Sequence, residues 1–206
     1  AAYTAAGGAL CLLLIPRDGG RARQGRPKRS ARVDYPAVLR APAFWIIAGG
    51  ILLCNLIFPL QSSQMKLMLM ENGASSMTAS WLISFFASGV LIGRFACGLA
   101  LDRFPAHLVA AIALGLPALG LFSLVAGLNS LPFLAGAVVM MGLSLGAESD
   151  LLAYLTMRYF RLEVYGTALG LVVGAMAIAT ALGSALLGLT LKLTGNFSLY
   201  MLLAGI

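Results

Sequence analysis

The sequence predicts an all-α membrane protein that crosses the bilayer several times. Sixty per cent of its 206 residues are hydrophobic and only 10% are charged, whereas about a quarter of the residues in a soluble domain are charged. Several apolar windows exceed the roughly 18 residues that a membrane-spanning helix needs. These runs are continuous, whereas the strands of a membrane β-barrel would alternate polar and apolar residues.

Seven apolar segments follow one another along the chain. Residues 1–15 are predicted to be the end of a preceding spanning helix rather than a signal peptide, because they lack a starting Met and a basic leader. A polar linker covers residues 16–42. Since both chain ends fall within apolar runs, we expect a piece of a longer protein. The spans predicted in residues 43–206 are Ala43–Met70, Met77–Leu101, His107–Gly127, Leu131–Met157 and Tyr165–Leu191, followed by a partial last span from about Phe197.

The fourteen basic residues are distributed unevenly between the two sides of the predicted membrane. Eight lie in the linker, between Arg17 and Arg40, without the aromatic residues that a nucleic-acid site would interleave with them. The linker and the loops at 102–106 and 158–164 together hold eleven bases, and the loops on the other side hold only Lys192. Basic loops stay in the cytoplasm. We therefore expect a cytoplasmic linker and a multi-pass protein of the inner or plasma membrane, bound to lipid and not to nucleic acid.

Motifs for enzyme chemistry are scarce. The three cysteines, at positions 11, 54 and 97, have no metal-ligand spacing, so we expect neither a metal nor a cofactor. The stretch "GLSLG", residues 142–146, matches the Gly-x-Ser-x-Gly pattern, but that pattern requires a strand-to-helix turn. The single histidine, His107, begins a different predicted helix and cannot serve Ser144. We expect no enzyme activity, and keep an intramembrane enzyme and a channel as remote alternatives.

Three ionisable residues lie well inside predicted spans: Arg94, Glu148 and Asp150. Charges at this depth are costly and usually functional. Counting from the predicted helix ends places Arg94 and Asp150 both roughly 12 Å deep, and Glu148 about 3 Å deeper. We expect Arg94 to pair with one of the two acids, without a choice between them. The pair is either a static structural ion pair, or it leaves the second acid free to exchange a proton.

Polar residues also mark the first full span: Asn55, Gln61, Gln64 and Lys66. Asn55 is near mid-membrane and is a candidate to hydrogen-bond a substrate. Lys66 is near the outer end, where it either extends to the interface or attracts an anionic substrate. Pro59 is expected to kink this helix. In a later span, Tyr154 either presents its hydroxyl to a cavity or packs as an ordinary aromatic residue.

Glycines at helical spacing predict close helix packing. They form two pairs and one triplet: Gly89 and Gly93, Gly142 and Gly146, and Gly166, Gly170 and Gly174. Small residues at this spacing let the backbones of membrane helices approach closely.

Two stretches resemble the major facilitator superfamily. "GLALDRFPAH", residues 98–107, resembles the signature cytoplasmic loop of that superfamily through Gly98, Asp102 and Arg103, although its usual later glycine and paired bases are missing. "GAESDLLAYLTMRYFRLEVYGTALG", residues 146–170, resembles the tenth and eleventh helices of bacterial members akin to monocarboxylate and oxalate–formate transporters. Arg158 belongs to the "RYF" part of this second stretch, and with Gly98, Asp102 and Arg103 it makes up the expected cytoplasmic gate motif.

The resemblance implies the six-helix C-terminal half of a twelve-helix transporter, with part of the preceding helix and a truncated last helix. It implies a symporter that moves a monocarboxylate or a related small organic anion by alternating access with proton coupling, and a drug–proton antiporter is the alternative. Its partner would be the N-terminal half of the same transporter. In the family, the acid at Asp102 caps a helix of the opposite half and holds the inner gate shut. The alternative is a purely structural role, in which Asp102 and Arg103 form a charged turn that ends a helix.

Overall fold

A computed structural model describes residues 31–126 and 130–205 of the chain, and within these ranges every regular element is a helix. The predicted helix end at 1–15 and the first half of the predicted linker lie outside the described residues. The elements are α2 (Ala31–Leu39), α3 (Pro42–Asn55), the π-helix η2 (Leu60–Gln64), α4 (Met65–Glu71), α5 (Ser76–Arg103), α6 (Ala106–Val125), α7 (Leu131–Tyr159), α8 (Tyr165–Thr194) and α9 (Ser198–Gly205).

Five helical stretches are long and apolar enough to cross a membrane, which confirms the all-α, multi-pass part of the prediction. They are Pro42–Glu71, Ser76–Arg103, Ala106–Val125, Leu131–Tyr159 and Tyr165–Thr194. Each begins within one residue of the predicted start and ends within three residues of the predicted end.

The last part of the predicted linker contains a helix, because residues 31–39 form α2. The end of this segment is apolar, and Val38 joins a buried cluster with Phe44 of α3 and Val172 of α8. This burial holds α2 against the ends of the two longer helices.

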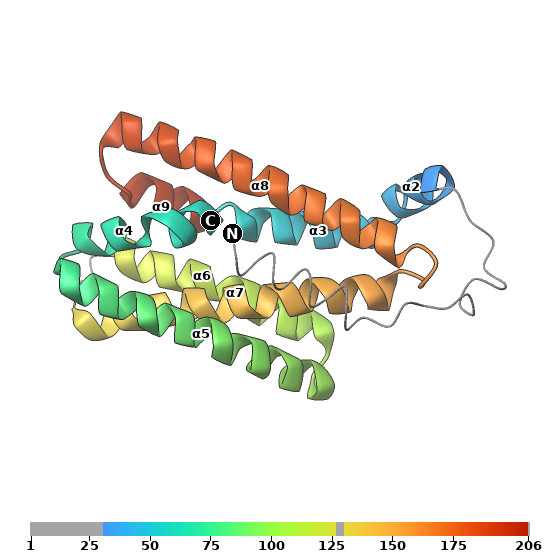
Figure 1. The fold of residues 1–206 in the computed structure, drawn as a ribbon, viewed down its shortest axis with the longest axis horizontal. Coiled ribbons are helices and arrows are strands. Elements are labelled where there is room, and N and C mark those ends of the chain that lie inside the picture. Colours follow the sequence, from blue (N-terminus) through green and yellow to red (C-terminus); the bar gives the residue numbers. More distant parts are fainter. Residues whose placement is uncertain (1–30, 127–129, 206) are drawn as a thin grey trace, which may run out of the picture.

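The long helices run side by side, with their connections at two opposite ends (Figure 1). One end carries α2 and the α5–α6 and α7–α8 connections, and we call it the basic end because Arg40, Arg103, Arg158 and Arg161 lie there. The other end carries the α4–α5 and α8–α9 connections and is called the opposite end. Helix α7 packs mainly on α5 and α6, while α3 packs mainly on α8. The short α9 joins the two groups, because it contacts both α6 and α8.

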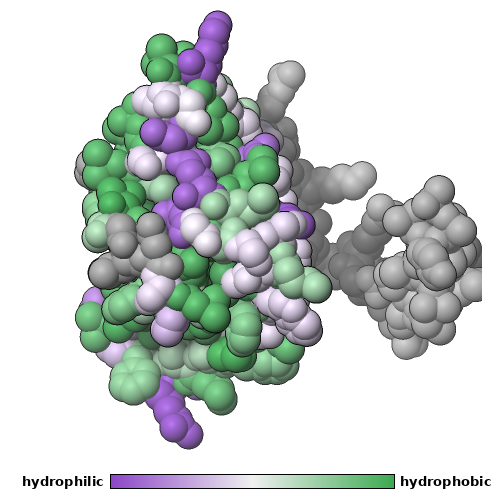
Figure 2. Space-filling view, turned by 90° about the vertical axis from the view of Figure 1, so that its left-hand side faces the viewer, coloured by the Kyte–Doolittle hydropathy of each residue, from purple (hydrophilic) through white to green (hydrophobic). Residues whose placement is uncertain are grey.

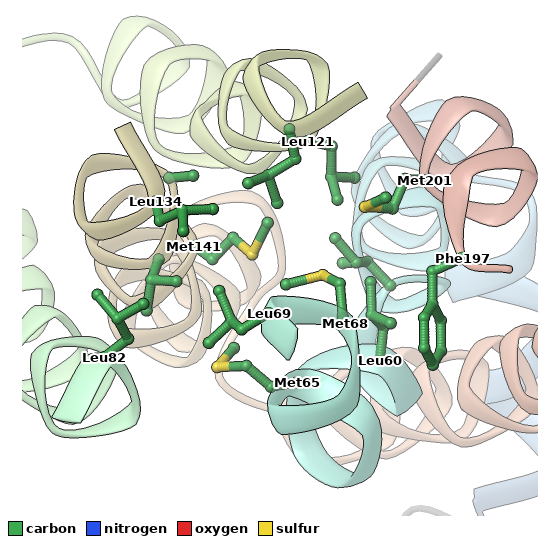
Figure 3. Close-up of a cluster of buried hydrophobic side chains, with 14 of the residues drawn as sticks. Leu60, Met65, Met68, Leu69, Leu82, Leu121, Leu134, Met141, Phe197 and Met201 are labelled. Atoms are coloured by element: carbon green, nitrogen blue, oxygen red, sulfur yellow. The ribbon is translucent and has the colours of Figure 1, made fainter. Parts of the chain in front are cut away.

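The largest buried cluster lies in the half of the bundle nearer the opposite end (Figure 3). Leu60, Met68 and Leu69 of the η2–α4 segment project into it and meet Leu121 of α6 and Met141 of α7, and all five are fully buried. A second cluster joins α2, α3, α7 and α8 nearer the basic end. The single span Pro42–Glu71 therefore belongs to two different cores.

The two glycine pairs bring α5 and α7 into backbone contact, as predicted. A Cβ atom added at Gly89 would lie 2.8 Å from the carbonyl oxygen of Val139, and one added at Gly93 would lie 2.8 Å from the Cα of Leu143. Additions at Gly142 and Gly146 would also collide with the backbone of α5. At this separation no side chain larger than hydrogen fits between the helices.

The glycine triplet of α8 does not make such a contact within the described residues. Gly166, Gly170 and Gly174 are exposed, and nothing lies within 4 Å of a Cβ added at any of them. The prediction of close packing there is therefore not met inside this chain. The small residues instead form part of an open surface.

Seen from the opposite end, hydrophilic residues run across the centre of the surface and also lie at its edges (Figure 2). Hydrophobic residues and residues of intermediate hydropathy lie between them. Large apolar side chains are also exposed along the helices, among them Ile92 and Phe95 of α5 and Ile112 of α6. An apolar lateral surface with a polar end is what a bilayer requires.

Candidate functional site

The span Pro42–Glu71 breaks near its middle. Helix α3 ends at Asn55, and a turn leads to Pro59 and the π-helix. Proline has no N–H to donate. The next residue, Leu60, donates to the carbonyl of Ile57 at 3.0 Å, not to Leu56 as in a regular α-helix. The helix is interrupted where a kink at Pro59 was predicted, and the Leu56 carbonyl is left free for another partner.

Asn55, the last residue of α3, binds Glu148 of α7. Its Nδ2 donates to the Ile51 carbonyl at 3.1 Å and to Oε1 of Glu148. Both side chains are buried, with 3% and 6% of their surface exposed. The sequence singled out both residues but did not pair them. Counted from the basic end, Asn55 lies about 20 Å and Glu148 about 16 Å along their helices, so both are near mid-membrane.

Tyr200 satisfies the backbone at the break. Its hydroxyl donates to the Leu56 carbonyl from α9, and its side chain is fully buried. Gly183 of α8 packs on the same peptide, since a Cβ added there would lie 3.1 Å from the Leu56 Cα. Sequence reasoning missed Tyr200. The available signal was Pro59, because a broken spanning helix needs an outside donor for its freed carbonyl.

The predicted ion pair between Arg94 and an acid is not formed. Within the described residues the ion pair joins Arg161 to Glu163 at 3.4 Å, and the Arg94 side chain is exposed. A Cβ added at Gly146 would lie 3.0 Å from the backbone nitrogen of Arg94, so these two residues lie at the same depth in the bundle. Asp150 is then one turn, about 6 Å, nearer the basic end, and Glu148 points to α3. The depth comparison failed because α5 and α7 are staggered by one turn.

Asp150, Tyr154 and Arg158 lie along one face of α7, as their spacing predicts. Asp150 is half-buried. Arg158 Nη1 donates to the Tyr154 hydroxyl at 2.9 Å, and its guanidinium carbon lies 6.0 Å from the centre of the tyrosine ring. The hydroxyl of Tyr154 is therefore engaged by its own helix.

The polar residues after the break differ in their exposure. Gln61 is buried, Gln64 is half-buried and Lys66 is exposed near the opposite end. Ser63, one of the two serines between the glutamines, donates to the Pro59 carbonyl at 2.7 Å. The structure therefore brings neither Gln61 nor Lys66 to the Asn55–Glu148 pair by any hydrogen bond among the described residues.

The Gly98–Asp102–Arg103 motif lies at the end of α5. Asp102 and Arg103 form the last helical turn instead of the predicted loop. Gly98 is exposed, with nothing within 4 Å of an added Cβ. Arg94, Gly98 and Asp102 are spaced by four residues and line one exposed strip of α5.

Glu71 is a second residue that the sequence analysis missed. Its two carboxylate oxygens accept the backbone N–H of Phe197 at 3.1 and 3.2 Å. Phe197 directly precedes α9, so the carboxylate caps the positive end of that helix. Its position, as an acidic residue just after an apolar run, was the feature of the sequence that could have marked Glu71 as a candidate.

Comparison with protein-family models, with curated proteins and with solved structures found no match to this chain. The resemblance to the major facilitator superfamily therefore rests on the residues of the chain itself.

Proposed function

We propose that this chain is part of a secondary transporter that moves a small organic anion, such as a monocarboxylate, by alternating access with proton coupling. The proposal follows the resemblance to the major facilitator superfamily. The observation that carries it is that Arg94 is exposed within the apolar helix α5.

Arg94 is nine residues from the end of α5, about 14 Å into the span. An arginine at the centre of a spanning helix costs roughly 2.5–3.5 kcal/mol when it faces lipid. Within the described residues no acid pairs with it. A water-filled path with an anionic ligand would supply the missing negative charge, and a carboxylate matches the two-pronged donor geometry of guanidinium.

Glu148 supplies the second group that the proposal needs. It is a buried carboxyl held by the amide of Asn55 instead of by a cation. A carboxyl group without a fixed counter-charge can take up and release a proton during a transport cycle. We assign the proton-exchanging role to Glu148 and the anion-binding role to Arg94.

The exposed faces of α5 and α8 support a second helical unit as the partner. On α8 a line of small residues runs the length of the helix and is exposed throughout: Gly166, Gly170, Gly174, Ala177, Ala181, Ser184 and Gly188. On α5 the exposed face carries Ser80, Ser84 and Ser88. Small and hydroxylated residues are typical of helix–helix contacts in membranes and not of lipid-facing surfaces. The N-terminal half of the same transporter would cover these faces.

The test is uptake by the full-length protein in proteoliposomes under an imposed pH gradient. The substrates compared are monocarboxylates, dicarboxylates and lipophilic cations. We expect saturable uptake of an anion, and we expect Arg94→Gln to lower kcat/KM at least about 30-fold, as losing one partner of a desolvated charge pair does.

Arg161→Gln is the matched control, because it removes the same charge from an exposed loop. Its uptake should equal that of the parent protein. Saturable transport of lipophilic cations alone would instead support the drug–proton antiporter, and flux that does not saturate would support a channel. Unchanged anion uptake in Arg94→Gln would refute the role of Arg94.

A further inference from the structure

A groove opens between α3, α6 and α7 at the basic end. Its volume is about 350 Å³. Ile47, Gly50 and Ile51 of α3 form one wall, and Ala111 and Leu114 of α6 form the other. The groove runs from Ala43, the second residue of α3, to Ile51, a depth of about 12 Å.

The polar side chains of the groove lie at its mouth. His107 is the second residue of α6, and Tyr159 is the last residue of α7. Both are exposed, and both are N–H or O–H donors. Arg40, also exposed, lies three residues before Ala43 in the turn between α2 and α3. A positive and donor-rich mouth above an apolar interior complements a molecule with an anionic head and a hydrocarbon tail.

We propose that this groove binds one acyl chain of an anionic phospholipid, whose phosphate lies against His107, Tyr159 and Arg40. Basic pockets between membrane helices are typical sites for anionic headgroups.

A second groove gives an internal comparison. It lies between α5, α6 and α7, has a volume of about 380 Å³, and is lined only by apolar residues such as Phe104, Leu108 and Ile112 together with Cys97. Its lining residues include no histidine, tyrosine or charged residue, so this groove should show little preference among headgroups. The headgroup preference is therefore specific to the groove that ends at His107.

The two tryptophans of the chain allow the groove that ends at His107 and the bulk lipid to be probed separately. Trp45 is next to Ile46, which lines the groove, and its indole N–H donates to the Leu39 carbonyl at 2.8 Å. Trp81 is exposed near the opposite end of α5. Acyl chains that carry bromine quench tryptophan on contact, so Trp81→Phe leaves a reporter of the groove and Trp45→Phe leaves a reporter of bulk lipid.

The experiment reconstitutes the full chain in vesicles with varying fractions of brominated phosphatidylglycerol or brominated phosphatidylcholine. At Trp45 we expect about a fivefold preference for the anionic lipid, the factor that one basic residue near an anionic headgroup supplies. At Trp81 we expect none. Arg40→Gln should reduce the preference at Trp45 to near one, while Arg161→Gln, which removes the same charge elsewhere at the basic end, should preserve it.

Filling the groove tests its interior. Gly50→Leu adds a side chain where nothing lies within 4 Å, and Gly115→Leu adds the same side chain at an equally open position outside both grooves. We expect Gly50→Leu to halve the quenching of Trp45 or more, and Gly115→Leu to leave it unchanged, with equal helicity in both variants. Equal quenching of Trp45 by the two lipids would overturn the proposal. Equal losses of Trp45 quenching in Gly50→Leu and Gly115→Leu would also overturn it.

Discussion

Replacing Asn55 by alanine measures how much the Asn55–Glu148 hydrogen bond stabilises the bundle. The chain contains a matched control. Asn55 and Asn72 are both buried, and each donates to the carbonyl four residues before it, at 3.1 and 2.9 Å. Asn55 alone of the two also reaches a carboxyl group, that of Glu148. The difference between Asn55→Ala and Asn72→Ala therefore isolates the contact with Glu148.

The expected size follows from the burial of Glu148. Side-chain hydrogen bonds between membrane helices contribute about 0.6 kcal/mol on average and at most about 1.7. A buried group left without its partner costs about 1–3 kcal/mol. Because Glu148 is only 6% exposed, it cannot exchange Asn55 for bulk water. We expect Asn55→Ala to lower the free energy of unfolding by about 1–2 kcal/mol more than Asn72→Ala does.

The assay is reversible unfolding by SDS in bicelles, followed by far-UV circular dichroism. A second arm repeats both substitutions in a Glu148→Leu background, where no carboxyl is left unsatisfied. In that background, Asn55→Ala and Asn72→Ala should lower the free energy of unfolding by the same amount. Equal losses for Asn55→Ala and Asn72→Ala in the parent protein would show that the contact with Glu148 contributes nothing and would refute this reasoning.

Three further predictions follow from the packing and the topology. Gly146→Ala should lower the free energy of unfolding by about 1–3 kcal/mol, because the added Cβ meets the backbone of α5. Gly174→Ala, at an open position, should raise the free energy of unfolding by up to about 1 kcal/mol. Equal effects of the two substitutions in the same SDS assay would contradict the close α5–α7 contact. Tyr200→Phe should lower the free energy of unfolding by about 1 kcal/mol, because the Leu56 carbonyl loses its hydrogen-bond donor. An unchanged free energy of unfolding would mean that water replaces the hydroxyl. In a cysteine-free background, Arg161→Cys should react with an impermeant maleimide only from the cytoplasmic side and Asn196→Cys only from outside; reversed labelling would refute the assigned orientation.

The spans could be predicted closely from the sequence, and the site only in part. Helices α7 and α8 begin at the predicted residues, Leu131 and Tyr165, because a long apolar run between polar turns fixes a spanning helix locally. The polar candidates were found because polar side chains at membrane depth are rare. Whether Arg94 pairs with an acid depended on the stagger of α5 against α7, which the backbone contacts at Gly93 and Gly146 set. That stagger cannot be predicted from the positions of the loops in the sequence.

The break in the span Pro42–Glu71 separates two mechanical units. Before the break, α3 belongs to a core shared with α2, α7 and α8; after it, η2 and α4 belong to the core at the opposite end. The hydrogen bonds that cross this boundary run to other helices, through Asn55 to α7 and from Tyr200 of α9 to Leu56. A tilt of α4 relative to α3 would therefore exchange one or two side-chain hydrogen bonds, each of about 1 kcal/mol, and leave the helical ladders on both sides intact. A continuous helix would have to break several backbone bonds for the same tilt. Broken helices at mid-membrane are a recurring feature of transporters for this reason, and the carboxyl at the boundary, Glu148, is the group to which we assign proton exchange.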